Sequence, residues 1–565
     1  MPILDADTEF ACKWIALSDA QVNEGIRDPI VAYEYMNRYY VVEGNKRVSV
    51  LKYFKADSIV ANVTRKIPKY SEDEDVKLYY EYMKFNQISG LNNIEFSKIG
   101  MVDKLLALMG STAIWDADTR MEFNSLVNHF TKAYEFRGGR KLPIRVGDAL
   151  TAFINVYGYN TVLGMSDDEL SLNIVKCWNE FVMLTEKQSV GLVMDPLAAE
   201  ERKGRNIFSY FMPSSAKKFT VAFLYPKSPD TSDWIYAHDL GRNYLEETFP
   251  DQMKTICVND VTEERTEQVL NDVIRQGADI IFEVAPQMMK DSLKVAVDHP
   301  DVKILNCSLN TSHKYIRTYY ARMYEAKFLS GMIAGALAEN DRIAYIADYP
   351  IYGMIANINA FALGASFTNP RARIYLAWST SENYDRERFL KDNNIQVVSD
   401  QDMITPRDPG RQFGLYECSE DGRKLNLVMP LWNWGVFYEK MIQSILAGSY
   451  QSEENSEGRA LNYWWGMSAG VIDLICSKNV PTGVKRLVDH LKSDIKKGDI
   501  VPFYGEIRAQ DGTLKNKKDK AMKPEAIMEM DWLTDNVIGE IPTMGELRAE
   551  ARPVVQIKGV EEKMK

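Results

Sequence analysis

The chain has 565 residues and a formal net charge of −11. At ~100–200 residues per domain, this length indicates about three domains rather than one core. The acidic balance excludes a chain that binds nucleic acid over its whole surface, and no stretch approaches the ~18 consecutive apolar residues that span a bilayer. The six cysteines lie far apart without CxxC spacing, so we expect reduced thiols and neither a disulfide framework nor a zinc site.

The opening residues do not have the pattern of a secretory signal. Such a signal needs a basic start, then ~7–15 apolar residues and a small-residue cleavage site. Acidic side chains at Asp5, Asp7 and Glu9 interrupt the first apolar residues instead. We therefore expect a cytoplasmic protein. The alternative is a membrane-associated or extracytoplasmic location.

Two short β-favouring runs, 30–33 and 39–42, have hairpin spacing and are followed by a glycine turn. This turn leads from Gly44 into a helix with Lys46 and Arg47 in its first turn. Free backbone N–H groups and the helix dipole favour an anion there. The pattern predicts a phosphate site at Gly44, Lys46 and Arg47. The alternative is a solvated turn that only packs the domain.

The stretch IRDPIVAYEYMNRYYVVEGNKRVSVLKYF resembles the N-terminal domain of the ParB/sulfiredoxin superfamily, in which a G-x-x-R turn follows a strand-rich hairpin. The resemblance covers residues 1–70 and implies an α+β fold. It also implies that Gly44, Lys46 and Arg47 grip the phosphates of a CTP-like nucleotide or of DNA. Sulfiredoxins carry a cysteine in this turn, where this chain has Asn45, so we do not expect their reaction.

Residues 71–215 have a helical pattern. Ser71–Glu74 and Ser166–Glu169 both fit the capping box, in which Ser and Glu satisfy each other's backbone N–H groups. We expect a helical domain there, joined by a linker at 213–218 to the next domain. After the second box, one helical face carries apolar residues that we expect in a core, namely Leu170, Ile174, Trp178 and Phe181.

From residue 218 onward, apolar strands alternate with helices. We expect strands at 219–225, 280–282, 302–306 and 342–347. Strands that alternate with helices indicate an α/β fold with parallel sheets, covered on both faces, and with ligands at the carboxyl ends of the strands. About 320 residues accommodate two such sheets, which predicts a bilobed binding protein.

The same region carries the blocks SDWIYAHDLGR, YYARMYEAKFLSGMIAGALA, ADYPIYGMIANINAFALGASFTNP, LWNWGVFYEKM and MDWLTDNVIGEIP. Residues 218–542 thereby resemble the basic membrane protein (PnrA-like) family of purine-nucleoside-binding proteins of ABC transporters. The resemblance implies a type I periplasmic-binding-protein fold, no catalysis, no cofactor, and a purine nucleoside or nucleobase as ligand. Residues 543–565 are expected to form a charged tail.

A purine presents a flat π-surface and a polar edge, so its pocket needs aromatic faces and directed hydrogen-bonding groups. Trp234, Tyr352 and Trp434 follow expected strands at 219–225, 342–347 and 425–429, where they would either stack on the ligand or pack core and hinge. The polar candidates are Asp233, Asp239, Asn306 and Glu417. Asp239 has i,i+3 spacing to Arg242, which favours an ion pair within the helix. Glu417 lies where the family often has an acidic run.

Three functions follow from these features. The first is a cytoplasmic sensor in which purine binding is communicated to the ParB-like domain. The second is the substrate-binding protein of an ABC transporter, with the transporter's membrane component as partner. The third is a nucleoside- or nucleotide-hydrolysing enzyme. The histidines have no metal-ligand spacing and the chain has no P-loop or G-x-S-x-G, so we expect no catalytic or metal-binding residues.

Overall fold

The computed structural model describes residues 5, 8–56, 58–111, 113–185, 190–196, 218–309, 313–403, 405–407, 410, 412–419, 422–446, 450 and 460–558. The chain divides into two compact units, Met1–Val175 and Lys176–Lys565. Most of the expected linker, residues 213–217, lies outside the described residues. None of the described helices is both long enough and apolar enough to cross a membrane.

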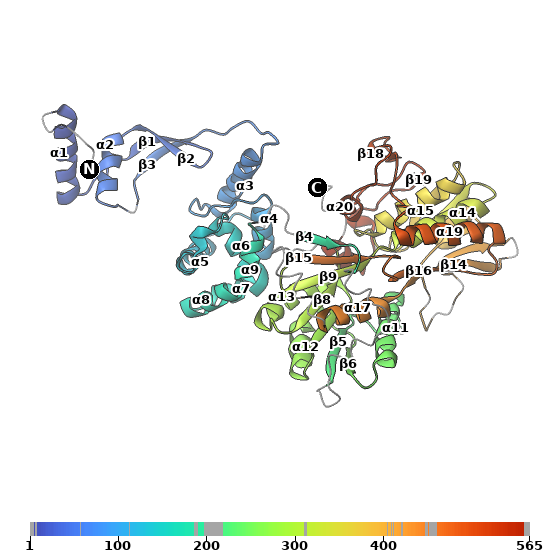
Figure 1. Ribbon diagram of the computed structural model, residues 1–565. Helices are drawn as coiled ribbons and strands as arrows, with labels where there is room; N and C mark the ends of the chain where they lie inside the picture. Colours follow the sequence, from blue (N-terminus) through green and yellow to red (C-terminus); the bar gives the residue numbers. More distant parts are fainter. Residues whose placement is uncertain are drawn as a thin grey trace. The chain divides into compact units, whose positions relative to one another are not determined.

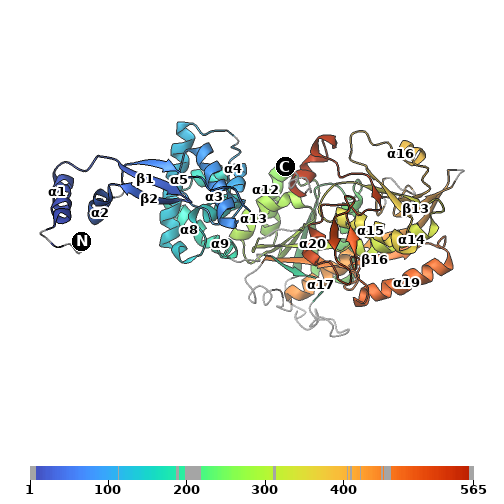
Figure 2. The same cartoon turned by 90° about the horizontal axis from the view of Figure 1, so that it is seen from above.

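The first unit begins with a small α+β part, drawn in dark blue in Figure 1. Its elements are α1 (Glu9–Asn23), β1 (Ile30–Tyr35), β2 (Arg38–Glu43), α2 (Asn45–Tyr53) and β3 (Ala61–Arg65). The strand order is β2-β1-β3, with β1 antiparallel to β2 and parallel to β3. The expected hairpin is confirmed, and its turn consists of Met36 and Asn37, which both have positive φ. Helices α1 and α2 lie side by side (Figure 2).

The rest of the first unit is helical, as the pattern predicted. Its helices are α3 (Glu74–Ser89), α4 (Met101–Leu108), α5 (Ala117–Phe136), η1 (Gly139–Lys141), α6 (Val146–Tyr157), α7 (Tyr159–Leu163) and α8 (Asp167–Lys176). The capping box at Ser166 and Glu169 is confirmed. The one expected at Ser71 is wrong, because Asp73 caps α3 instead and accepts from the N–H of Asp75 at 3.2 Å. Helix α9 (Trp178–Met183) follows in the second unit.

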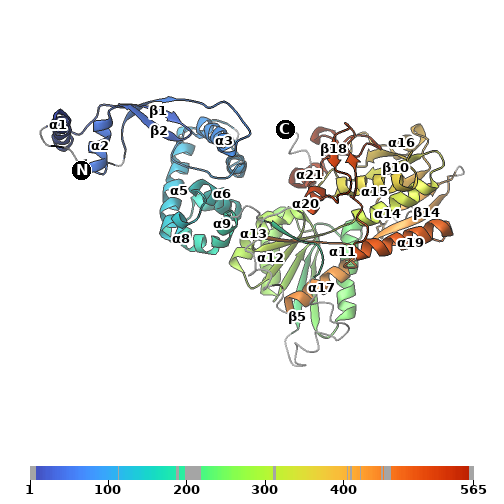
Figure 3. The same ribbon diagram turned by 45° about the horizontal axis from the view of Figure 1, so that its top comes forward.

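The second unit is bilobed. Lobe 1 is built on a seven-stranded sheet of order β4-β15-β9-β8-β7-β5-β6, in which every pair is parallel. Its strands are β4 (Val190–Val193), β5 (Phe219–Leu224), β6 (Met253–Val258), β7 (Ile280–Glu283), β8 (Lys303–Cys307), β9 (Ile316–Ala321) and β15 (Ala460–Trp465). Figure 3 shows α12 (Glu263–Arg275) and α13 (Met289–Asp298) on one side of these strands, with α11 (Asp233–Thr248) and α17 (Trp434–Leu446) on the other.

Lobe 2 has a second seven-stranded sheet, of order β16-β14-β13-β12-β10-β11-β19. Its strands are β10 (Arg342–Ala347), β11 (Arg373–Trp378), β12 (Val397–Ser399), β13 (Leu415–Cys418), β14 (Lys424–Trp432), β16 (Ile472–Cys476) and β19 (Val537–Ile538). The expectation of parallel sheets fails for β13, β14 and β16, which pair antiparallel. The connection from β13 to β14 is short, and only an antiparallel pair can be joined by a short turn.

Helices α14 (Tyr324–Leu337), α15 (Met354–Thr368), α16 (Arg386–Asp392) and α19 (Thr482–Lys497) complete lobe 2, and α14 packs against both α15 and α19. Both sheets contain the order 2-1-3-4-5, as β6-β5-β7-β8-β9 and as β11-β10-β12-β13-β14. The chain passes between the lobes after β9, after β14 and after β15. This confirms the expected bilobed α/β fold of the type I periplasmic-binding-protein class. In this strand order, ligands bind where the order reverses.

Residues 543–565 were expected to form a charged tail, but the described residues among them form helical turns that pack on lobe 2. The remaining elements are β17 (Ile507–Arg508), β18 (Leu514–Asn516), α20 (Pro524–Met528), η4 (Met544–Glu546) and α21 (Arg552–Lys558). Leu547, Ala551 and Val555 are buried and pack against Tyr349 and Ile351 in the loop after β10. The described part of this segment therefore covers one edge of lobe 2.

Candidate ligand-binding cleft

A cavity of about 350 Å³ lies at the carboxyl ends of the strands of both lobes. Its lining comes from the segments that follow β5, β7 and β8 in lobe 1 and from those that follow β10, β11 and β12 in lobe 2. Both points of strand-order reversal therefore open into it. The volume is within the ~300–1,000 Å³ typical of small-molecule sites.

One wall of the cavity is aromatic. Trp234 lies in the first turn of α11, which Ser232 caps by accepting from the N–H of Ile235. Its indole Nε1 donates to the carbonyl oxygen of Val284 at 2.8 Å, which fixes the ring. The Tyr320 ring stacks against Trp234 with centroids 5.9 Å apart, and the Trp432 ring meets it edge-on at 5.2 Å. These three rings form a preorganised aromatic wall, and all three line the cavity.

The loop between β10 and α15 contributes to the lining from lobe 2. Tyr349, Ile351 and Tyr352 line the cavity there, together with Met354 at the start of α15. The C-terminal segment reaches the same place, because Val554 of α21 also lines it. Aromatic surface therefore borders the cavity from both lobes.

Two carboxylates from opposite lobes lie close to one another in the cavity. Burial, and then the like charge of Asp348, raise the pKa of Asp233 to about 6. Asp233 also accepts a hydrogen bond from the Trp234 N–H at 2.8 Å. Asp348 is exposed at the cavity, but desolvation by the surrounding protein still raises the pKa of its carboxyl group. The site therefore offers one acceptor, Asp233, with a pKa of about 6, beside a second carboxylate whose pKa is also raised.

A buried ion pair lies at the base of the cavity. Lys327 of α14 is 3% exposed and pairs with Asp402, which follows β12. Burial alone would lower the pKa of Lys327, but the Asp402 carboxylate and the Tyr345 hydroxyl hold it above its ordinary value. The ammonium also lies 5.3 Å from the centroid of the Tyr345 ring. The Lys327 ammonium therefore stays charged, and it lines the cavity together with its partner Asp402.

A second pair fixes the rim of lobe 2. Arg386 of α16 lies 2.8 Å from the Asp400 carboxylate, which also accepts from the Tyr416 hydroxyl at 3.2 Å. Burial raises the pKa of Asp400 even though Arg386 lies beside it. Both partners line the cavity, so this network sets the position of the segment after β12.

Among the described residues, several buried polar atoms at or near the cavity have no hydrogen-bond partner, including Ser308 Oγ, Tyr345 Oη and Asn306 Oδ1. Within the described part of the chain, the hydroxyl oxygen of Ser308 is buried without a hydrogen bond, and Ser308 lines the cavity. Asn306 lies behind the lining and donates to Glu283 at 2.7 Å and to the Ala285 carbonyl at 3.0 Å. Burial raises the pKa of Glu283 to about 7, opposed by hydrogen bonds from Ser292 and Asn306. The Ser308 hydroxyl is therefore a candidate hydrogen-bonding group at the cavity.

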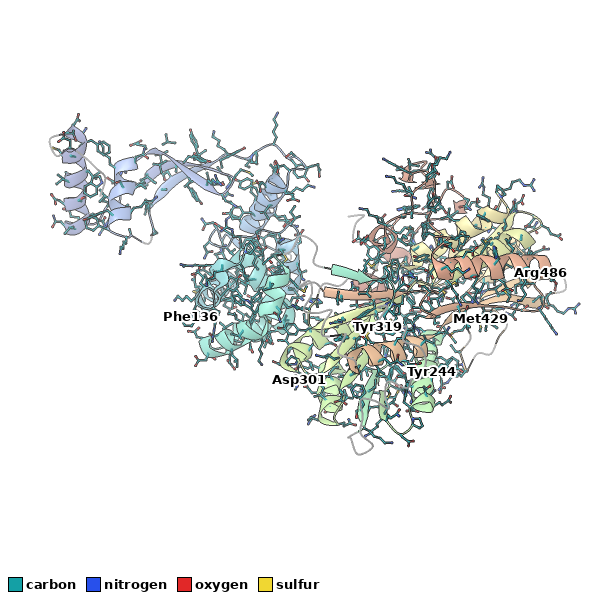
Figure 4. The ribbon with its side chains drawn as sticks, viewed as in Figure 1. Phe136, Tyr244, Asp301, Tyr319, Met429 and Arg486 are labelled. Atoms are coloured by element: carbon teal, nitrogen blue, oxygen red, sulfur yellow. The ribbon has the colours of Figure 1, made fainter. Side chains whose placement is uncertain are left out.

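Of the six residues expected to bind the ligand, Asp233, Trp234 and Tyr352 line the cavity, whereas Asn306, Trp434 and Glu417 do not. Trp434 is fully buried in lobe 1, where its ring stacks on His238 at 4.3 Å and on Trp432 at 5.5 Å. Figure 4 shows its neighbour Tyr319 inside the same lobe. Glu417 is the third residue of β13 and alternates with Tyr416 and Cys418, so it faces away from Asp400. The expected ion pair of Asp239 with Arg242 is confirmed at 2.8 Å.

The sequence analysis missed several lining residues. Asp348 directly follows β10, and its position at a strand's carboxyl end could have marked it. Lys327 could have been found as a single base within the apolar run of α14, because a lysine is almost never fully buried unless it is paired. Tyr320 and Trp432 lie within strands, where an aromatic residue is ordinary, so no sequence signal separates them from core residues.

The expected phosphate site lies in the first unit. Gly44 has φ 99°, and a Cβ there would lie 2.6 Å from the Ile30 side chain, so the turn requires glycine. The Arg47 guanidinium donates to the carbonyl oxygens of Asp28 at 3.2 Å and Pro29 at 2.9 Å. The Lys46 ammonium lies 4.5 Å from the centroid of the Phe10 ring. In this arrangement Arg47 holds the chain before β1, and the phosphate site remains a prediction.

Comparison with known proteins finds similarity to substrate-binding proteins over part of the second unit. Residues 218–405 match the family model described as ABC transporter substrate-binding protein PnrA-like. A purine-binding protein of Brucella abortus is 27% identical over 339 residues, which cover 58% of this chain and 95% of the relative. A putative ABC transporter glucose-binding protein of Haloferax volcanii is 24% identical over 344 residues, covering 59% and 83%. These matches support the PnrA-like resemblance.

Solved structures are similar at lower identity. An ABC transporter solute-binding protein from Conexibacter woesei is 15% identical, with a TM-score of 0.38, and covers 50% of this chain and 98% of its own. A transcriptional activator of the comK gene from Bacillus halodurans is 14% identical, with a TM-score of 0.39, and covers 50% and 99%. The ParB-like resemblance of residues 1–70 remains a prediction.

Proposed function

We propose that the cleft of residues 218–542 binds a purine nucleoside or nucleobase without catalysing a reaction. The observation that carries the proposal is the aromatic wall of Trp234, Tyr320 and Trp432, which borders the same cavity as the carboxylates of Asp233 and Asp348. A base stacks on such a wall, and a carboxylate accepts hydrogen bonds from an exocyclic amine or from ribose hydroxyls.

The other expected residues have different parts in this proposal. Asn306 holds the Ala285 segment from behind, and Trp434 supports Trp432 by stacking, so both act by positioning the lining. Glu417 lies outside the lining and has no role in it. The family match and the purine-binding relative support the same ligand class.

Isothermal titration calorimetry tests the proposal with adenosine, guanosine, inosine and their free bases. We expect saturable binding of at least one of them. Tyr320→Ala, which removes one ring of the aromatic wall, should weaken that binding about two- to tenfold, since a stacked aromatic contributes ~0.5–1.5 kcal/mol beyond its buried area. Tyr504→Ala, at an exposed tyrosine that does not line the cavity, serves as the control. The absence of both heat and thermal shift with all of these compounds would refute the proposal.

A sugar is the second candidate ligand. The Haloferax relative is described as a putative glucose-binding protein, and carboxylates beside aromatic faces also suit the hydroxyl groups of a pyranose. Titration with glucose and ribose separates the two candidates. Binding of a free sugar with higher affinity than any nucleoside would replace the purine proposal.

We further propose that the chain acts as a cytoplasmic sensor, in which ligand binding changes what the ParB-like domain binds through Gly44, Lys46 and Arg47. Coupled sites change each other's affinity by the same factor, typically about 5–150-fold. Purine affinity should therefore change in the presence of saturating CTP or DNA. An unchanged purine affinity would mean that the two domains are independent binding modules. Recovery of the protein outside the cell with its first residues intact would favour the transporter role.

The enzyme alternative has a direct test. Incubation of the protein with nucleosides and nucleotides, followed by chromatography, reveals free base, ribose or phosphate if the chain hydrolyses them. Among the described residues, no group of three or more His, Cys, Asp or Glu side chains could hold a metal ion. We expect unchanged substrate.

A further inference from the structure

The sheet of the first unit has one face that carries exposed tyrosines. Residues paired across neighbouring strands point to the same face, and the register pairs Tyr33 with Tyr40, and Tyr35 with Arg38. Alternation along β1 puts Tyr33 and Tyr35 on this face as well. We call Tyr33, Tyr35 and Tyr40 the open tyrosine face. The three side chains are 41%, 44% and 51% exposed.

The opposite face of the same sheet is packed along β1 only, because Tyr39 of β2 and Val63 of β3 lie on that face and are 53% and 45% exposed. Ile30, Ala32 and Glu34 alternate with the tyrosines and are buried. The Glu34 carboxylate accepts from the Tyr79 hydroxyl of α3 at 2.8 Å and pairs with Arg65 at 2.7 Å. The buried contacts of β1 therefore lie on the Glu34 side of the sheet. The open tyrosine face lies on the other side of β1, and a cluster of exposed aromatic residues commonly marks an interaction site.

Basic residues accompany the open tyrosine face. Arg38 is exposed beside Tyr35, and the ammonium of Lys66 lies 4.9 Å from the centroid of the Tyr33 ring. The acid of this face, Glu43, lies at its far end opposite Val31 and is 3.7 Å from the Arg47 guanidinium. Further along the chain, residues 44–69 contain seven bases and a single acid, although the whole chain has a net charge of −11. This part of the molecule therefore attracts a polyanion.

The geometry fits bases arranged along a strand. Neighbouring strands lie about 4.8 Å apart, and residues two positions apart along a strand are separated by about 6.6 Å. Tyr33 therefore has one tyrosine beside it and another along its own strand, at spacings that present two or three π-faces. Proteins that bind single strands combine such aromatic platforms with cations that contact the phosphates. A folded protein partner does not need both stacked aromatic rings and phosphate-contacting cations on one sheet face.

We propose that the open tyrosine face binds single-stranded nucleic acid, with bases stacked on Tyr33, Tyr35 and Tyr40 and phosphates contacted by Arg38 and Lys66. This site is distinct from the expected phosphate turn at Gly44, because it needs exposed bases rather than a nucleotide's phosphates alone. It is also independent of purine binding in the cleft, which lies in the other unit.

Fluorescence anisotropy of the full-length protein with labelled oligo-dT and oligo-U 12-mers at 50 mM salt tests the proposal. We expect saturable binding, and the two oligonucleotides distinguish DNA from RNA. Tyr33→Ala and Tyr40→Ala should each weaken binding at least fivefold. Tyr33→Phe should retain it, because phenylalanine keeps the ring. Arg38→Ala should reduce the slope of log affinity against log salt by about 0.7, as for one lost phosphate contact.

Phe136→Ala is the matched control, since Phe136 is an 83% exposed aromatic at the end of α5, outside the sheet (Figure 4). It should leave binding unchanged. Circular dichroism confirms that each variant is folded. Failure to bind either oligonucleotide, or equal loss in Phe136→Ala and Tyr33→Ala, would overturn the proposal. So would sedimentation data in which Tyr33→Ala converts a dimer to a monomer, because the face would then bind a second copy of the chain.

Discussion

The ligand cleft and the open tyrosine face both combine aromatic rings with charged side chains, but they differ in burial. In the cleft, Lys327 is buried and paired with Asp402, and burial raises the pKa of Asp233 to about 6. On the sheet, Arg38 and the tyrosines remain in water. We therefore expect charges in the cleft to affect both stability and ligand affinity, and charges on the sheet to act mainly through long-range attraction that salt screens.

Lys327→Met gives the largest expected effect. Removal of one partner leaves the Asp402 carboxylate without its counter-charge, and breaking such a buried pair costs about 3–5 kcal/mol. Differential scanning calorimetry should show earlier unfolding of the second unit, with the first unit unaffected. An unchanged unfolding temperature of the second unit would mean that solvent already screens the pair. The cleft and the sheet would then not differ in the effect of burial on their charges.

Gly44→Ala tests the first unit at a glycine that combines a positive φ with a close contact. Its φ of 99° and the contact of an added Cβ with Ile30 should together cost about 1–3 kcal/mol. Gly25→Ala is the control, since Gly25 also has a positive φ but a Cβ there would meet nothing within 4 Å. Chemical unfolding followed by circular dichroism should show a smaller loss for the control. Equal losses would show that the close contact with Ile30 contributes nothing.

The pH dependence of ligand affinity should report Asp233. Its carboxylate is ionised only above a pKa of about 6, so affinity should fall as the pH drops from 7 to 5, by up to tenfold per pH unit. Asp233→Asn should bind more weakly at pH 7 and lose this dependence. Asp348→Asn removes a like charge, so it should shift the midpoint to lower pH. An unshifted midpoint would show that the two carboxylates do not interact.

Stability should respond to the same group in the opposite direction. Because folding raises the pKa of Asp233, the folded state holds the proton more tightly than the unfolded state. The contribution to stability is complete below the unfolded pKa of ~3.9 and is lost as the pH rises through about 6. Thermal unfolding of Asp233→Asn should therefore lack this decline, and a parallel profile for both proteins would contradict the assignment.

Lys13→Ala gives the smallest expected effect. Lys13 pairs with Glu9 on α1, but both side chains are more than half exposed. Such a pair contributes about 0.3–0.5 kcal/mol, less at high salt. Unfolding curves of the variant and the parent protein should nearly coincide at 0.5 M salt. A loss comparable to that of Lys327→Met would show that exposure does not separate the two regions.

Strand and helix patterns were sufficient to predict the bilobed fold and the edge of the sheets where the cleft lies. Asp233, Trp234 and Tyr352 could be placed at the cleft because each follows a strand, and this position is local to the sequence. Trp434 meets the same criterion, yet its side chain points into lobe 1. The direction of that side chain depends on packing against His238 from another helix, which no local pattern encodes.

The antiparallel half of lobe 2 and the pairing of Lys327 with Asp402 could not be predicted for a similar reason. Both depend on which distant segments meet, and the sequences of β13, β14 and β16 are compatible with either direction of pairing. The open tyrosine face could not be predicted from the sequence either. Its residues are ordinary strand residues, and only the register together with burial of the opposite side of β1 shows that they remain exposed.

The strand order of lobe 1 also affects how the protein is made. Strand β15 lies between β4 and β9, so β9 cannot complete its pairing until the ribosome has added roughly 140 further residues. At 5–20 residues per second, this delay is on the order of 10–30 s. During this time the edge of β9 exposes unpaired N–H and C=O groups, which can pair with another nascent chain. Strand β4 is the first strand of lobe 1 to be made, yet it can join the sheet only after β15, so synthesis of Trp465 sets the earliest moment at which the lobe 1 sheet can be completed.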